Sequence, residues 1–211
     1  MKTVLCYGDS NTYGYNPVDG LRYPYDKRWV NILANKLGDG YQVVAEGLNG
    51  RTTVFDREGE PWKNGRPYLK PCLATHRPID YLIFMLGTND CLATLELNAD
   101  AIADGMEQLI LDARELLAEK QGYLPNIIIV APAAIRDDYH NSPFIYKLND
   151  YAVRKSHEIA DLYKSLAEKH GCTFVNACET VEVSELDSLH LTEKGHMQLA
   201  ELICSCIEQN V

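Results

Sequence analysis

Short apolar runs alternate with longer segments of helical periodicity, and this alternation restricts the fold more than any other feature of the sequence. Strand-like runs begin at Val4, Tyr41, Tyr81, Ile127 and Phe174. Helical patterns fill most of the intervals between them, which predicts βαβ units with right-handed crossovers and a parallel sheet covered by helices on both faces. Five strands favour a flavodoxin-like, three-layer α/β/α fold with a five-stranded parallel sheet over a closed barrel.

The boundaries of these elements follow from the apolar pattern and from helix caps. The run 81–86 is apolar on both faces, as in a central parallel strand. Asn98 is a suitable N-cap for a helix that carries one apolar stripe to about residue 120. The remaining elements are expected as strands at 4–7, 41–45, 127–130 and 174–175, and as helices at 29–37, 145–169 and 192–208.

The length and charge of the chain limit the number of domains and the class of partner. With 211 residues and no linker or low-complexity segment, residues 1–211 are expected to form a single domain. Its 30 acidic and 20 basic side chains give a formal net charge of −10. Nucleic acids and anionic membranes favour basic surfaces, so neither is expected as a partner.

The cysteines and the N-terminus indicate a compartment. The seven cysteines are odd in number and scattered, and they include no Cys-x-x-Cys pair, which argues against a disulfide framework and a zinc site. No apolar run approaches the roughly 18–20 residues of a membrane span. The N-terminal apolar run reaches Gly8 too early for a signal peptide. We expect a cytoplasmic protein with reduced thiols.

The residues directly after each strand are the candidates for a functional site, because ligands of open α/β sheets bind at the carboxyl ends of the strands. Four such segments are rich in polar and small residues, namely 8–11, 46–53, 87–90 and 187–190. They are expected to meet at one edge of the sheet.

The side chains of these segments fit nucleophilic acyl transfer. A serine hydroxyl needs a base to take its proton, and His190 is suited to act on Ser10 in this way. Asp187 precedes His190 on the same turn and can hold the imidazole in the required tautomer. A tetrahedral intermediate needs donors for its oxyanion. The candidates are the backbone N–H groups of Ser10 and Gly50 and the side-chain amide of Asn89.

The same segments resemble a known family. The four sequence blocks of the SGNH (GDSL) hydrolases are similar, in this order, to Gly8-Asp9-Ser10-Asn11, Gly50, Gly87-Thr88-Asn89-Asp90 and Asp187-Ser188-Leu189-His190. The bacterial arylesterase/acyltransferase branch of that family is further similar at Arg28-Trp29, at 46–53 and at 72–76. The resemblance implies the SGNH hydrolase fold and a serine ester hydrolase that needs no metal and no cofactor.

The resemblance also implies a role for each matched residue. Ser10 is the expected nucleophile, His190 the base and Asp187 the residue that orients it. The expected oxyanion donors are Ser10, Gly50 and Asn89.

Two departures from the family pattern concern the substrate. Asn11 stands where the family name has Leu, and Asn49-Gly50 replaces the small pair of the arylesterase branch, which leaves the acceptor and the acyl chain length open. Asn11, Trp29 and Trp62 are candidates for the substrate pocket.

Two further interpretations stay open on sequence alone. In the first, Ser10, His190 and Asp187 act on thioesters, acetylated sugars or lysophospholipids. A function of another class is a flavodoxin-like binding or phospho-accepting module, in which Asp9 and Asp90 hold a magnesium ion. That module leaves Gly50 and Asn89 without a role, so we favour a serine esterase that acts on small-molecule, short-acyl esters.

The segment 51–78 has no clear period and is rich in proline, and loops of this length usually cover a functional site. We expect it to cover the pocket or to pack against a neighbouring subunit of a homo-oligomer. A covered pocket holds less water, which favours short acyl groups and transfer of the acyl group to an organic alcohol.

Overall fold

Five parallel strands form a sheet in the order β2-β1-β3-β4-β5 in the computed structural model, which describes residues 1–209. The strands are β1 (Lys2–Gly8), β2 (Tyr41–Gly47), β3 (Tyr81–Met85), β4 (Asn126–Ala131) and β5 (Thr173–Asn176). This is the flavodoxin-like order. After β1 the chain adds β2 on one side of it, and it then adds β3, β4 and β5 in turn on the other side. The predicted five-stranded parallel sheet is confirmed.

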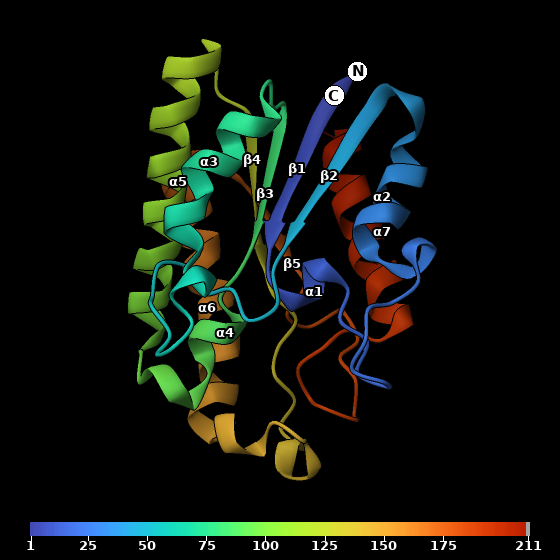
Figure 1. Ribbon diagram of the computed structural model, residues 1–211, viewed down its shortest axis with the longest axis vertical. Coiled ribbons are helices and arrows are strands. Elements are labelled where there is room, and N and C mark those ends of the chain that lie inside the picture. Colours follow the sequence, from blue (N-terminus) through green and yellow to red (C-terminus); the bar gives the residue numbers. More distant parts are fainter. Residues whose placement is uncertain (210–211) are drawn as a thin grey trace.

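Helices cover both faces of the sheet, which confirms the three-layer arrangement (Figure 1). One layer consists of α2 (Trp29–Leu37) and α7 (Glu193–Gln209). The other consists of α3 (Gly65–His76), α5 (Ala99–Gln121) and α6 (Asp150–His170). Two short helices, α1 (Ser10–Tyr13) and α4 (Thr88–Cys91), directly follow β1 and β3. None of the helices within residues 1–209 is long and apolar enough to cross a membrane.

The central strands are apolar on both faces because each face packs against helices. In β1, Leu5 and Tyr7 belong to the core beside α3, α5 and α6, whereas Val4 and Cys6 belong to the core beside α2 and α7. Every residue of β3 is buried. Alternate side chains of a strand point to opposite faces, so two cores require a continuous apolar run rather than an alternating one.

Asparagine side chains determine where α5 and α6 begin. Asn98 Oδ1 accepts a hydrogen bond from the N–H of Ala101 at 2.8 Å, which confirms the predicted cap of α5. Asn149 caps α6 in the same way, through the N–H of Ala152 at 2.7 Å. The expectation of a helix from residue 145 is therefore wrong at its start. Residues 145–147 form a separate 3₁₀ turn, and Leu148 is extended.

The segment 51–78 is not irregular throughout, because it contains α3. Asn64 caps this helix, and Leu69, Cys72 and Leu73 are buried along one side of it. Pro67 lies in the first turn, where its missing N–H has no intrahelical acceptor, and only Pro71 removes a hydrogen bond from the helix interior. Burial of the apolar side outweighs that loss.

Candidate active site

The turn between β1 and α1 places Ser10 at the carboxyl edge of the sheet. Asp9 Oδ1 accepts a hydrogen bond from the N–H of Asn11 at 2.9 Å and so caps α1. The turn needs glycine at position 8, because a Cβ there would lie 2.1 Å from Thr12 Oγ1. Ser10 is the first residue of α1, and its side chain points toward the loop that follows β5.

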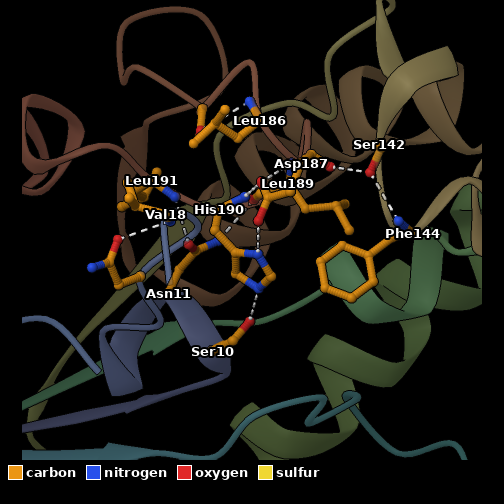
Figure 2. A network of polar contacts seen from close by, with 12 residues as sticks. Ser10, Asn11, Val18, Ser142, Phe144, Leu186, Asp187, Leu189, His190 and Leu191 are labelled. Atoms are coloured by element: carbon orange, nitrogen blue, oxygen red, sulfur yellow. Dashed lines mark hydrogen bonds and ion pairs between the residues drawn. The ribbon is translucent and has the colours of Figure 1, made fainter. Parts of the chain in front are cut away.

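A continuous chain of hydrogen bonds joins Ser10 to two residues of that loop (Figure 2). Ser10 Oγ lies 2.9 Å from His190 Nε2, and His190 Nδ1 lies 2.6 Å from Asp187 Oδ2. All three residues are buried, and Asp187 is only 1% exposed. The three residues predicted from sequence to act together are thus in direct contact, although about 180 positions separate Ser10 from the other two.

The turn 187–190 holds the Asp187 carboxylate in place. Asp187 Oδ1 accepts hydrogen bonds from the N–H groups of Leu189 at 3.1 Å and His190 at 3.0 Å. Ser188 adopts a left-handed φ of 63°, which directs both N–H groups back to the carboxylate at some cost in backbone strain. Burial works against the charge, but the hydrogen bonds from the His190 ring and the two N–H groups outweigh it and lower the pKa of Asp187. The carboxylate therefore stays ionised at neutral pH.

Two further side chains fix this turn from neighbouring segments. Asn11 Oδ1 accepts from the N–H of Leu191 at 3.0 Å, and its amide donates to the carbonyl of Leu189 at 3.3 Å. Ser142 Oγ donates to the carbonyl of Asp187 at 2.6 Å. Asn11 does not line the cavity beside Ser10. The expectation of a pocket residue at Asn11 is therefore not met, because both polar ends of its side chain bind the backbone of this loop.

Aromatic rings restrict the orientation of the imidazole. The ring centroid of Tyr15 lies 4.1 Å from that of His190, at an interplanar angle of 36°. Phe144 approaches from another side at 5.8 Å and 67°. With Nδ1 bound to the carboxylate and the ring enclosed by these two residues, Nε2 is directed at Ser10.

Gly50 lies in a tight turn opposite the serine. The N–H of Arg51 donates to the carbonyl of Leu48 at 3.0 Å, and Gly50 has a φ of 81° that favours glycine. Within residues 1–209, the N–H groups of Gly50 and Ser10 donate to no other protein group. Both residues line the same cavity, so both N–H groups are available to a ligand there.

Asn89 follows β3 and lines the same cavity. Its side-chain amide donates to the carbonyl of Arg51 at 3.1 Å and to Asp9 Oδ2 at 3.3 Å. These bonds connect the three loops that carry Ser10, Gly50 and Asn89. The three candidate oxyanion donors are thus brought together by the fold.

Asp9 and Asp90 bind protein donors in the loops around the site. Asp9 accepts from Asn11 and Asn89, and Asp90 accepts from the N–H of Thr53 at 3.0 Å and from its hydroxyl at 2.6 Å. Burial raises the pKa of each carboxyl to about 6. A magnesium ion would have to displace these donors, so the alternative of a phospho-accepting module has no support from this arrangement.

The cavity beside Ser10 has a volume of about 200 Å³ and an uneven lining. Apolar surface comes from Tyr15, Leu92, Phe144 and Leu189, and basic side chains come from Arg57, Lys63 and Lys147. The sequence does not indicate that these residues line the site. They lie in loops and short 3₁₀ turns, where no periodicity or spacing shows which side chains will face it.

Neither predicted tryptophan lines this cavity. Trp29 is fully buried in the core that includes α7, and its backbone N–H donates to His196 Nδ1 at 3.3 Å. Trp62 is 62% exposed and lies in a separate groove with Tyr68 and Pro71. The prediction of a pocket role is wrong for Trp29, because the apolar face of α2 packs inward. It is not met for Trp62, which lines the neighbouring groove instead.

One group of side chains within residues 1–209 has the composition of a metal site. Glu46, Cys72 and His76 place one ligand atom each within 4.8 Å of one another. His76 Nε2 lies 2.8 Å from Glu46 Oε1, and burial raises the pKa of the Cys72 thiol to about 12. The group does not line the cavity that contains Ser10 and His190. A hydrogen bond between His76 and Glu46 accounts for the contact of these two residues without an ion.

Comparison with known proteins identifies related enzymes along the whole chain. The model of the GDSL-like lipase/acylhydrolase family matches residues 6–198. Est24, a carbohydrate acetylesterase from Sinorhizobium meliloti, is 33% identical, with a TM-score of 0.93 and coverage of 100% of both chains. The aryl esterase of M. smegmatis is also 33% identical, with a TM-score of 0.92 and coverage of 100% of both chains.

A curated relative is longer than this chain. It is an acetylxylan esterase from Xylanibacter ruminicola, 26% identical over 219 residues that include 97% of this chain. The matched region is 43% of the relative, so the chain spans less than half the length of that protein.

Proposed function

The chain belongs to the GDSL-like lipase/acylhydrolase family, and from this premise we propose that it hydrolyses small, short-acyl esters through a triad of Ser10, His190 and Asp187. The predicted membership in the SGNH (GDSL) hydrolase family is confirmed, and its structural relatives include an aryl esterase and a carbohydrate acetylesterase. The observation that carries the proposal is the buried hydrogen-bond chain from Ser10 Oγ through His190 to Asp187. Turnover of a chromogenic acetate ester by the purified protein is the first test.

In the proposed acylation step, Ser10 Oγ attacks the carbonyl carbon of the ester while His190 Nε2 accepts the hydroxyl proton. The electron pair of the C=O bond moves to oxygen, and the oxyanion accepts hydrogen bonds from the N–H groups of Ser10 and Gly50. Asn89 adds a third hydrogen bond when its amide exchanges the 3.3 Å bond to Asp9 Oδ2 for one to the oxyanion. His190 then donates its proton to the alcohol oxygen as the C–O bond breaks. The charge of Asp187 stabilises the transient imidazolium.

Deacylation repeats these steps with a new nucleophile. Water, or an alcohol, loses its proton to His190 Nε2 and attacks the acyl carbon. The second tetrahedral intermediate expels Ser10 Oγ, which recovers the proton from His190. The products are the carboxylic acid, or a new ester, and the free enzyme.

Replacing Asn89 with Ala is expected to lower kcat by about 10²–10³-fold and to change KM little. One oxyanion donor contributes this much when it binds the transition state but not the ground state. Steady-state kinetics with an aryl acetate measures both parameters. Asn35→Ala, an exposed position on α2, is the matched control and should leave both unchanged. A rise in KM at constant kcat would instead make Asn89 a substrate-binding residue.

Esters of short acids, from acetyl to about butyryl, are expected to be the preferred substrates. A cavity of about 200 Å³ with Leu92, Phe144 and Leu189 on its walls offers an apolar but narrow space for the acyl group. Two relatives are named as a carbohydrate acetylesterase and an acetylxylan esterase, which supports acetyl as the acyl group. A series of 4-nitrophenyl esters of increasing chain length measures the preference as kcat/KM. Faster turnover of octanoyl than of acetyl esters contradicts a narrow site.

Transfer of the acyl group to an alcohol is tested in the same reaction. The segment 51–64 contributes Arg57 and Lys63 to the cavity wall and so limits access of bulk water on that side. With a vinyl or aryl acetate in buffer, added benzyl alcohol should yield benzyl acetate above the enzyme-free control. Hydrolysis alone would remove the acyltransferase part of the proposal and leave the esterase part intact.

A further inference from the structure

The cavity beside Ser10 is lined by three basic residues and by no acidic residue of the described chain. Within residues 1–209, Arg57, Lys63 and Lys147 are its only lining residues that carry a permanent charge at neutral pH. The full chain has a formal net charge of −10. A concentration of positive charge on an acidic protein, at the place where substrate enters, is not explained by the hydrolysis of neutral esters.

Arg57 and Lys63 lie directly beside the turn that presents Gly50. A Cβ built on Gly50 would lie 2.7 Å from Arg57 Nη1 and 3.1 Å from Lys63 Nζ. Arg57 Nη1 also donates to the carbonyl of Gly50 at 3.3 Å. The side chains are only 14% and 19% exposed, so the fold holds both charges against the cavity rather than in bulk solvent.

One carboxylate partly balances these charges. Glu60 Oε1 lies 2.5 Å from Lys63 Nζ, and Glu60 Oε2 lies 3.7 Å from Arg57 Nη2. Lys147 makes no ion pair within 4.0 Å in residues 1–209, and its ammonium lies 5.5 Å from the ring centroid of Phe144. Three positive charges therefore share one negative charge.

We propose that the enzyme prefers esters that carry a carboxylate or another anionic group, and that Lys63 and Lys147 bind this group. The inference rests on the proposed esterase function and concerns the substrate of the same site. Half-buried cations lose hydration, and Glu60 offsets only part of that loss for Lys63 because it also faces Arg57. An anionic substituent offsets the rest, whereas a neutral substituent does not. Lysines act as point charges, so they select for charge rather than for one oxyanion geometry.

The anionic group can reach the basic residues from either part of the ester. Lys63 lies on the Gly50 side of the cavity, and Lys147 lies beside Phe144, which packs on His190. Two matched pairs of esters distinguish the two positions. The acyl pair is 4-nitrophenyl hemisuccinate against 4-nitrophenyl succinamate. The alcohol pair is 3-carboxyphenyl acetate against 3-carbamoylphenyl acetate.

For wild type at low ionic strength, kcat/KM corrected for enzyme-free hydrolysis should be about tenfold higher for the anionic member of at least one pair. The advantage should shrink when ionic strength rises to about 0.5 M, because salt screens the attraction between the anionic ester in solution and the basic cavity. Equal kcat/KM within both pairs overturns the inference while esterase activity stands. Absence of turnover of all four esters overturns the proposed function and this inference with it.

Variants then assign the preference to the two lysines. Lys63→Gln and Lys147→Gln should each lower the ratio of anionic to neutral kcat/KM by about threefold to fivefold. Lys147→Glu should remove the preference altogether. Lys70→Gln is the matched control, because Lys70 is exposed on α3 and pairs with Glu115 away from the cavity. If the Gln variants slow neutral and anionic esters equally, the lysines act on the oxyanion in general, and the inference fails.

Discussion

Replacing Ser10 with Ala is expected to lower kcat for an aryl acetate by about 10⁴-fold or more, with no change in the fold. The substitution removes the atom that forms the acyl-enzyme, and no other hydroxyl is hydrogen-bonded to His190 Nε2 in residues 1–209. Ser10 faces the cavity, so water can take the position of its hydroxyl and the vacated Nε2 stays solvated. The circular dichroism spectrum and the thermal midpoint should therefore match wild type.

Ser165→Ala is the matched control for this variant. Ser165 is exposed on α6, and its hydroxyl donates to the carbonyl of Asp161 one turn earlier. Its loss should leave kcat unchanged. A Ser10→Ala enzyme within tenfold of wild type would remove Ser10 from the mechanism, whatever the geometry of its contacts.

Replacing His190 with Ala is expected to be almost as severe as the loss of Ser10. Without Nε2 there is no base to accept the serine proton, and Asp187, which lies on the far side of the ring, cannot replace it. His140→Ala, an exposed position, should retain activity. Steady-state kcat for the same aryl acetate measures both variants.

The double variant of Ser10 and His190 tests whether the two residues act as one unit. Its kcat should lie close to that of either single variant, since removing one member already abolishes the step to which both contribute. If the increases in activation free energy of the two single variants add up in the double variant, the two side chains act independently. Such a result is incompatible with the proton transfer proposed here.

Much of the fold could be predicted because one physical requirement repeats along the chain. A parallel strand between two helical layers must be apolar on both faces, and the continuous apolar run of β3 follows this rule. The same rule places the functional loops at one edge of the sheet, which is why Ser10 and His190 could be paired without any measurement of distance. Asn98 shows that a single cap residue defines a helix start within one position.

The errors concern elements whose formation depends on tertiary contacts. The prolines of α3 obscure its period, and the helix becomes evident only when Leu69 and Leu73 are seen to pack into the core. The sequence around Trp29 does not distinguish a core residue from one in a pocket wall. Only the packing of α2 against α7 shows that Trp29 is a core residue. No spacing in the sequence relates Lys147 to Lys63, so their meeting at one cavity could not be foreseen.

Covalent labelling tests most directly whether Ser10 carries the acyl group. The purified enzyme is treated with a phosphonate ester, which mimics the tetrahedral intermediate and stays bound to an activated serine. We expect one phosphonyl group per chain, located by peptide mass mapping on Ser10, with loss of activity in proportion to labelling and no label on the Ser10→Ala variant. Complete inactivation with Ser10 unmodified, or full activity with Ser10 fully labelled, would contradict the proposed mechanism.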